Sequence, residues 1–146
     1  MYEYGCKVKR VVDGDTIDIT IDLGFKIFYD TRVRMYGIDT PESRTKDKDE
    51  KARGLLAKKF LQKKVKTGKS FKIQTQKDSS GKYGRVIGIL IIDDININEL
   101  IVSEHLGVRY FGQSKEDIEA EHLKNKQILL EKGLYEILWK NIICLF

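Results

Sequence analysis

Residues 17–23 alternate strictly between an aliphatic side chain and a polar one, and no other segment constrains the fold as strongly. The segment reads Ile-Asp-Ile-Thr-Ile-Asp-Leu, so every second side chain can face a core while the others face water. This period of two residues is typical of a half-buried β-strand. Gly24 then marks a turn, and we expect a return strand over residues 25–38 and a shorter first strand over residues 6–12. The first forty residues therefore predict three consecutive strands.

Arginines and apolar residues alternate near the end of the expected return strand. Val33 and Met35 share one face of the strand, and Arg32 and Arg34 share the other. We therefore expect Arg34 to point away from the core. Arg32 is then either a residue behind a site or a solvent-exposed one.

The apolar pattern changes to a helical period over residues 49–65. The apolar side chains in this segment fall on one helical stripe: Ala52, Leu55, Leu56 and Phe60. Lysines cover most of the remaining surface. This segment predicts an amphipathic helix.

Two strands and two helices are predicted in the rest of the chain. In chain order they are a strand at 71–75, a strand at 86–92, a helix at 98–106 and a helix at 114–132. Gly107 and Gly133 close the two helices. About five strands with interspersed helices predict one α+β domain of 146 residues, a small β-barrel with helices packed on it. Residues 134–146 are an apolar extension of this domain, with a role that the pattern does not define.

The only proline of the chain, Pro41, lies between two acidic residues, Asp39 and Glu42. Proline fixes its own φ and disfavours the helical region for Thr40, so a rigid turn is expected after a strand. Two carboxylates and a backbone carbonyl suit a hard cation, and Arg34 just upstream suits a phosphate. Taken alone, the segment is more simply explained as an ordinary polar loop.

Two further polar clusters give the turn more weight. They are Asp13-Gly14-Asp15-Thr16, between the first two strands, and Lys82-Tyr83-Gly84-Arg85, before a later strand. Turns and strand ends can meet at one rim of a closed barrel, which would gather three carboxylates and two arginines. These residues are Asp15, Arg34, Asp39, Glu42 and Arg85. Such a set can hold a cation, take a proton from water and neutralise charge on a phosphodiester during hydrolysis.

In their order and spacing, the three motifs resemble those of the staphylococcal nuclease (thermonuclease) family, over residues 7–132. The resemblance implies a five-stranded OB-fold barrel with about three helices. It also implies a calcium-dependent nuclease (endo- or exonuclease) that cleaves DNA and RNA and leaves 3′-phosphate ends. We expect a monomer that contacts mainly the phosphates of single strands or frayed duplex, so binding should weaken with salt.

The resemblance also implies roles for individual residues. Asp15 and Asp39 match direct ligands of the metal, and Thr40 matches the residue that supplies a backbone carbonyl. Glu42 matches the carboxylate proposed as general base. The remaining matches are two arginines on the scissile phosphate, Arg34 and Arg85, and four positions in substrate binding, Lys82, Tyr83, Tyr110 and Phe111. The register at the last two is open by about one residue.

Several polar residues have a simpler explanation. Asp13 is expected to accept backbone N–H groups in its own turn. Asp18 fits a solvent-facing strand position, although it lies close to Asp15 in sequence. His105 and His122 belong to no metal-spaced pair or triad, so helix-surface positions are expected for both.

Two other functions stay open at this point. One is an OB-fold module that binds nucleic acid without cleaving it, and the other is a calcium-binding interaction domain. The presence of all the acidic and arginine positions argues against the first, and the second has no need of Arg34 and Arg85.

Composition narrows the partners but not the location. A net charge of +5 and a pI of about 9.1 favour a polyanionic partner. No apolar run of about 18 residues exists, so no membrane span is expected. The first residues lack the pattern of a signal peptide, but a signal removed before residue 1 would leave no trace, so cellular location is undetermined. Cys6 and Cys144 lie at opposite ends, and two separate thiols are favoured over one disulfide.

Overall fold

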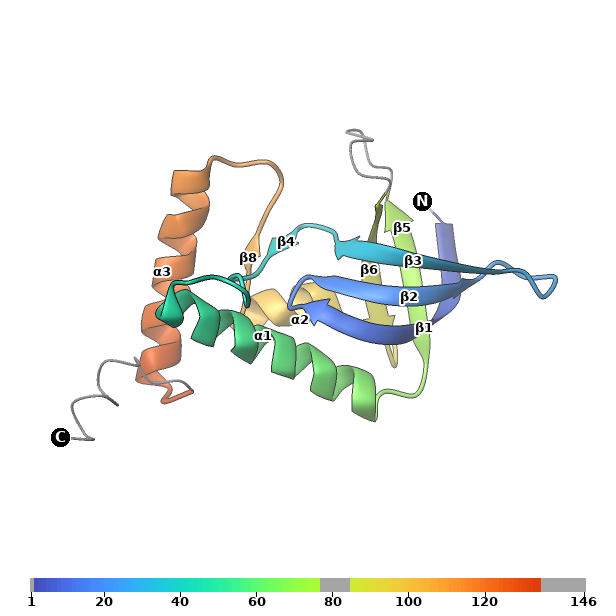
Figure 1. Cartoon of the computed structure of the whole chain (residues 1–146), viewed down its shortest axis with the longest axis horizontal. Coiled ribbons are helices and arrows are strands. Elements are labelled where there is room, and N and C mark those ends of the chain that lie inside the picture. Colours follow the sequence, from blue (N-terminus) through green and yellow to red (C-terminus); the bar gives the residue numbers. More distant parts are fainter. Residues whose placement is uncertain (1, 77–84, 135–146) are drawn as a thin grey trace.

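Five long strands close into a barrel (Figure 1). The structure is a computed structural model, which describes residues 2–76 and 85–134. The barrel strands are β1 (Tyr2–Asp13), β2 (Thr16–Asp22), β3 (Phe28–Met35), β5 (Phe71–Gln76) and β6 (Val86–Ile92). They are hydrogen-bonded in the order β3-β2-β1-β5-β6, and a parallel pairing of β3 with β6 closes the sheet on itself. With three helices packed around it, this barrel confirms the predicted α+β OB-fold class.

The alternating segment forms β2 and supplies the centre of the core. Ile17 and Ile19 are fully buried, and the polar residues between them face outward. Burying such a side chain contributes on the order of 1.5–3 kcal/mol. On β3, Val33 and Met35 also face the core, as predicted, which leaves Arg34 on the outer face.

The turn between β2 and β3 is longer than predicted, so β3 begins at Phe28 rather than near residue 25. Backbone bonds between Leu23 and Ile27 and between Ile27 and Gly24 close the turn. Gly24, Phe25 and Lys26 all have positive φ, which bends the chain before the strand can restart. The turn projects well beyond the barrel (Figure 1), and Phe25 is almost fully exposed.

The predicted return strand also ends early, at Met35. Gly37 has a φ of 75°, and this left-handed residue redirects the chain. The next two residues form the short strand β4 (Ile38–Asp39), which pairs with β8 (Val108–Arg109) instead of with the barrel. This separate pair carries Asp39 past the end of β3.

Helix α1 (Lys48–Thr67) runs along the barrel and packs against β1 (Figure 1). Its buried residues are Arg53, Gly54, Ala57 and Leu61. The prediction that Leu55 lies on the buried stripe of this helix was wrong, since Leu55 is exposed. A Cβ on Gly54 would lie 2.5 Å from the carbonyl oxygen of Glu42, so the helix turns its small residues toward the polar turn.

Helix α2 (Ile97–Ser103) follows the short strand β7 (Ile95–Asn96) and ends three residues before the predicted end. Two residues after the helix ends, His105 adopts a φ of 61°, which turns the chain so that Leu106 is buried in the core. Asn98 is buried, donates to the carbonyl oxygens of Tyr36 (2.8 Å) and Gly88, and accepts from the backbone N–H of Leu90. Its side chain ties α2 to β6 and to the end of β3.

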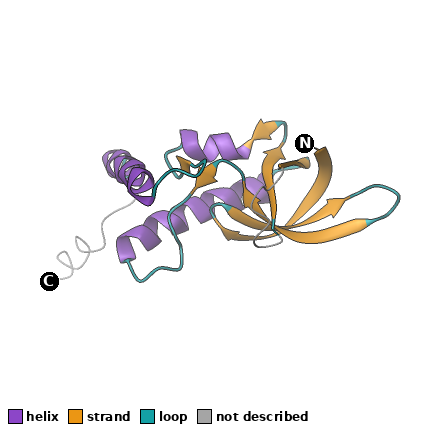
Figure 2. Ribbon diagram, turned by 90° about the horizontal axis from the view of Figure 1, so that it is seen from above, coloured by secondary structure: helices purple, strands orange, loops and turns teal. Residues whose placement is uncertain are grey.

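Helix α3 (Lys115–Glu131) is capped as predicted. Ser114 accepts from the backbone N–H of Asp117 at its start, and Gly133 follows its end with a φ of 67°. Seen from above, the helices lie toward one end of the molecule and the β2–β3 turn lies at the other (Figure 2).

Some predictions concern residues outside the described ranges. These residues are Lys82, Tyr83, Cys144 and all of the apolar extension 134–146 except its first residue. Cys6 is described, and burial raises the pKa of its thiol to about 11, so it stays uncharged near neutral pH and is a poor nucleophile. Of the helices in the described ranges, none has the length and apolar character needed to cross a membrane.

Candidate active site

The turn between β1 and β2 places Asp15 at the rim of the barrel. Asp13 accepts from the N–H of Gly14 (2.9 Å), which is the structural role expected for it. Asp15 is only 7% exposed, and its two carboxylate oxygens accept from the Thr16 hydroxyl and from the backbone N–H of Thr40, each at 3.0 Å. Asp15 therefore joins this turn to the polar turn at residues 39–42.

Arg34 binds both predicted metal-ligand carboxylates at once. Its guanidinium forms an ion pair with Asp15 and a second one with Asp39, where Nη2 lies 3.1 Å from Oδ1. The side chain is 21% exposed, so one partly buried cation lies between two carboxylates. Charge-assisted bonds of this kind are stronger than neutral ones and fix the geometry of all three groups.

Arg32, two positions earlier, has a different partner. It forms a bidentate contact with Asp18 on β2, at 2.8 Å and 3.2 Å, and half of its side chain is exposed. The hydrogen bond from Arg32 lowers the pKa of Asp18 below its usual value, with further help from the nearby positive charges. Of the two roles considered for Arg32, the structure favours that of a solvent-exposed residue.

The polar turn at residues 39–42 is held from behind. Thr40 and Pro41 are buried, and α1 packs Gly54 directly against the backbone of Pro41 and Glu42. The side chain of Glu50 accepts from the backbone N–H of Glu42 at 3.4 Å. The turn is thus fixed by packing while the Glu42 side chain stays exposed.

Glu42 has its pKa raised above the usual value. Partial loss of hydration is the main cause, and the negative charges of Asp13, Asp15, Asp39 and Glu50 add to it. A carboxylate with a raised pKa is a better proton acceptor near neutral pH, which suits a general base.

One hollow at the barrel rim, the rim hollow, gathers the predicted catalytic residues. Its polar lining is made of Asp13, Asp15, Thr16, Arg34, Glu42, Arg44 and Arg85. Arg85 reaches it because Val86, the first residue of β6, pairs with Val33 on β3. Arg44 was not predicted as a site residue, although its position two residues after Glu42 was a usable signal.

A second hollow, the α3 groove, lies between the polar turn and α3. Among its lining residues are Arg34, Asp39, Thr40, Glu42, Tyr110 and His122. Tyr110 therefore lies beside the site, with its backbone N–H donating to the carbonyl oxygen of Gly37. Phe111 lines neither hollow and packs edge-on against Tyr36, with ring centroids 5.8 Å apart.

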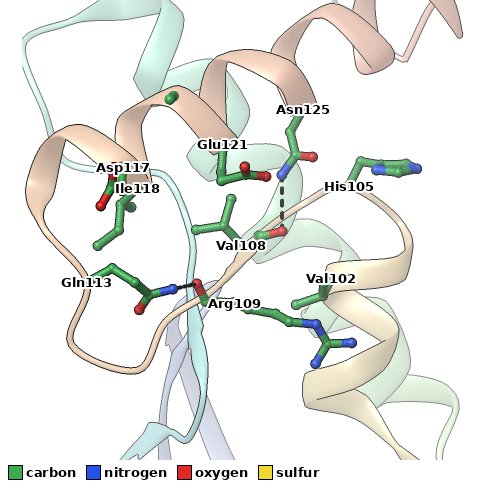
Figure 3. A pocket seen from close by; sticks show the side chains of 11 residues that line it. Val102, His105, Val108, Arg109, Gln113, Asp117, Ile118, Glu121 and Asn125 are labelled. Carbon is green, nitrogen blue, oxygen red and sulfur yellow. Dashed lines mark hydrogen bonds between the residues drawn. The ribbon is translucent and has the colours of Figure 1, made fainter.

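His122 belongs to the site, and its predicted helix-surface position was wrong. Its Nε2 lies 2.8 Å from Oδ2 of Asp39, and its side chain is only 13% exposed. One signal was available, because His122 lies seven residues before the buried Leu129, on the same helical stripe. His105, by contrast, lines a separate hollow beside α3 (Figure 3), which contains none of the predicted site residues.

The donor chemistry of Asp15, Asp39 and Thr40 fits a hard cation. Two carboxylates lie close enough to share one positive group, the Arg34 guanidinium, and oxygen donors are the ligands that Ca²⁺ prefers. Within residues 2–76 and 85–134, no three His, Cys, Asp or Glu side chains are grouped so that they alone could hold a metal ion. A cation here would therefore also need backbone or water oxygens.

Comparisons with known proteins give a matching family and several relatives. The family model described as Staphylococcal nuclease homologue matches residues 32–134. A thermonuclease from Staphylococcus intermedius is 33% identical over 99 residues, which cover 68% of this chain and 55% of that protein. An uncharacterized protein from Bacillus anthracis is 35% identical over 103 residues, which cover 70% of this chain and 45% of that protein. The chain thus spans about half the length of the curated relatives that it matches.

Proposed function

Because this chain belongs to the staphylococcal nuclease family, we propose that it is a calcium-dependent nuclease that hydrolyses phosphodiester bonds of DNA and RNA and leaves 3′-phosphate ends. The rim hollow is the observation that carries the proposal. Asp15, Glu42 and two arginines from distant parts of the chain line it together. Carboxylates and arginines around one small open space suit a phosphate that water attacks.

Asp15, Asp39 and the carbonyl of Thr40 would hold the calcium ion. When bound, the ion supplies Lewis-acid polarisation of a phosphoryl oxygen. Asp15 is already oriented by Thr16 and by the backbone of Thr40, so little reorganisation of its carboxylate is needed.

Glu42 orients the attacking water and takes its proton as the water oxygen bonds to phosphorus. The bond from phosphorus to the 5′-oxygen breaks, the 5′-oxygen leaves with the bonding electron pair, and the phosphate stays on the 3′ side. Its raised pKa and its exposed position at the edge of the rim hollow both support this role. General-base assistance is worth about 10²–10⁴ in rate.

Arg34 and Arg85 donate hydrogen bonds to the phosphoryl oxygens as negative charge grows on them. Without substrate, Arg34 is bound to two carboxylates, so phosphate has to replace at least part of that contact. An arginine on a transferring phosphoryl group contributes about 10³–10⁵ in rate.

The substrate is expected to extend from the rim hollow into the α3 groove. We propose that Tyr110, which lines the α3 groove, stacks on a base there. Lys82, Tyr83 and Phe111 are the other proposed contacts. Single strands and frayed duplex fit such a groove best. We also propose that residues 1–146 form one domain that acts as a monomer.

A nicking assay tests the proposal and separates it from its rivals. Supercoiled plasmid and labelled RNA are incubated with the full chain in calcium, in magnesium and in excess chelator, and product ends are examined for 3′-phosphate. Calcium-dependent cleavage is expected. Binding of nucleic acid without cleavage would support a non-catalytic OB-fold module, and calcium binding without either would support an interaction domain.

A further inference from the structure

His122 makes the one direct contact described between α3 and a proposed metal-ligand side chain. Its Nε2 lies 2.8 Å from Oδ2 of Asp39, while Oδ1 of the same carboxylate accepts from Arg34 at 3.1 Å. Because an ionised carboxylate can only accept, Nε2 must carry the proton in this bond. The two oxygens of Asp39 are therefore held by two different donors, and rotation of the carboxylate would break both contacts.

The position of His122 is fixed by the contacts that hold α3 against the rest of the molecule. In α3, which the structure describes in full, Leu129 is the only buried residue, so apolar packing fixes one end of the helix. Polar contacts fix the middle: Asn125 donates to the carbonyl oxygen of Gly107 at 3.1 Å (Figure 3), and Lys126 pairs with Asp49 at 2.8 Å. These residues lie three and four positions after His122, on the same face of the helix.

The helix contacts and the Asp39 contact are parts of one arrangement. Gly107 immediately precedes Val108, and Val108 pairs with Asp39 across the β4–β8 ladder. The backbone of Asp39 is thus fixed by β8, and α3 is fixed to the residue just before that strand. His122 then meets the side chain of Asp39 at a defined distance.

We propose that His122 is a positioning residue that holds the Asp39 carboxylate in its calcium-binding orientation. The inference rests on the proposed function, because it assigns His122 a task on a metal ligand and not on the reacting atoms. It also says what α3 adds to the site: the helix holds the second oxygen of a carboxylate whose first oxygen is bound by Arg34 of the barrel. Partners of this kind, one layer behind a metal ligand, typically change metal affinity by about 10–100-fold when removed.

Calcium binding by the metal-free full chain tests the proposal directly. The dissociation constant is measured by calorimetry for the wild type, His122→Ala and His122→Gln, with thermal unfolding in chelator to check the fold. His122→Ala is expected to weaken calcium binding by about 10-fold or more. His122→Gln keeps an N–H donor near the Nε2 position and is expected to recover most of that loss.

His105→Asn is the matched control. His105 also lies beside α3, but it lines the separate hollow of Figure 3 and not the α3 groove. Asparagine tolerates the left-handed backbone at this position. The calcium affinity of His105→Asn should equal that of the wild type.

Two results would overturn the inference while leaving the proposed function intact. One is wild-type calcium affinity in His122→Ala. The other is calcium binding in His122→Gln that is as weak as in His122→Ala although both variants melt like the wild type. If the wild type itself neither binds calcium nor cleaves nucleic acid, the proposed function fails, and the role of His122 in calcium binding fails with it.

Discussion

Arg32 and Arg34 lie two positions apart on the outer face of β3, yet they belong to different kinds of cluster. Arg32 meets Asp18 directly across the β2–β3 ladder, and half of its side chain is exposed. Arg34 is 21% exposed and meets Asp15 and Asp39, which come from two separate turns. The register of the sheet is enough to make the first pair. The second cluster forms only because the polar turn folds back over the barrel rim.

Removing each arginine gives the largest expected contrast. Arg34→Ala should lower the rate of plasmid cleavage at saturating calcium by about 10³–10⁵, because it removes a donor to the phosphoryl group. Arg32→Ala removes an equally long side chain from the same strand face and should change the rate less than twofold. More than a tenth of wild-type activity in Arg34→Ala would contradict the assignment.

Replacing the proposed base should have the next largest effect. Glu42→Gln is expected to lower cleavage by about 10²–10⁴ at neutral pH, since the amide cannot take a proton from water. The raised pKa of Glu42 also predicts a change in the stability of the metal-free protein: Glu42→Gln should raise stability although it lowers activity. The folded state holds the proton more tightly than the unfolded chain, so ionisation of Glu42 costs stability as pH rises through its folded pKa.

Thermal unfolding in chelator measures this second effect. Glu42→Gln should melt above the wild type at pH 7, and the difference should vanish below about pH 4, where Glu42 is protonated in both states. An unchanged or lower melting temperature at pH 7 would mean that neither loss of hydration nor the neighbouring carboxylates make ionised Glu42 destabilising.

Disturbing the support of the polar turn should affect the contacts of Arg34 with Asp15 and Asp39 more than the pair of Arg32 and Asp18. In Gly54→Ala, the new Cβ would lie about 2.5–2.6 Å from the carbonyl oxygens of Pro41 and Glu42. Overpacking of this kind costs about 1–3 kcal/mol, against a helix-propensity gain of up to about 1 kcal/mol. We expect a net loss of stability in urea and slower cleavage. Gly5→Ala, where the added Cβ meets nothing within 4 Å, is the control and should keep both.

The smallest effect is expected at the exposed pair. The pKa of Asp18 is lowered by Arg32, so the pair stabilises the folded state above the pKa of the unfolded chain and loses this contribution as pH falls through the lower, folded pKa. Asp18→Asn should therefore lower the melting temperature slightly at pH 7, and the difference should disappear in acid. Exposed pairs contribute little, so a large loss would show that Asp18 has a role beyond this contact.

Much of the barrel could be predicted because its signals are local. The alternation at residues 17–23 places Ile17 and Ile19 in the core whatever the rest of the chain does. Errors arose where distant segments meet. The buried face of α1 is set by how closely Gly54 must approach the polar turn, and a count of apolar residues gives no information about that distance.

For the site as well, the residues that lie in short motifs were predicted, and a residue that depends on a distant contact was missed. Asp15, Arg34, Asp39, Glu42 and Arg85 were all named as candidates from short motifs, and four of them line the rim hollow while Asp39 contacts Arg34. His122 was missed because its partner lies 83 residues away, and histidine on a helix has no short motif that predicts such a contact. Phe111 was named, but it packs against Tyr36 and lines neither hollow.

The sequence by itself determined the approximate places of the five barrel strands, the order of the motifs and the turn at Pro41, because alternation and φ restrictions act within a few residues. Only the tertiary structure decided which of two equivalent arginines joins two carboxylates, and that His122 reaches Asp39. Those outcomes depend on where β4, β8 and α3 pack against the barrel rim, and that packing is set by contacts between residues far apart in the chain.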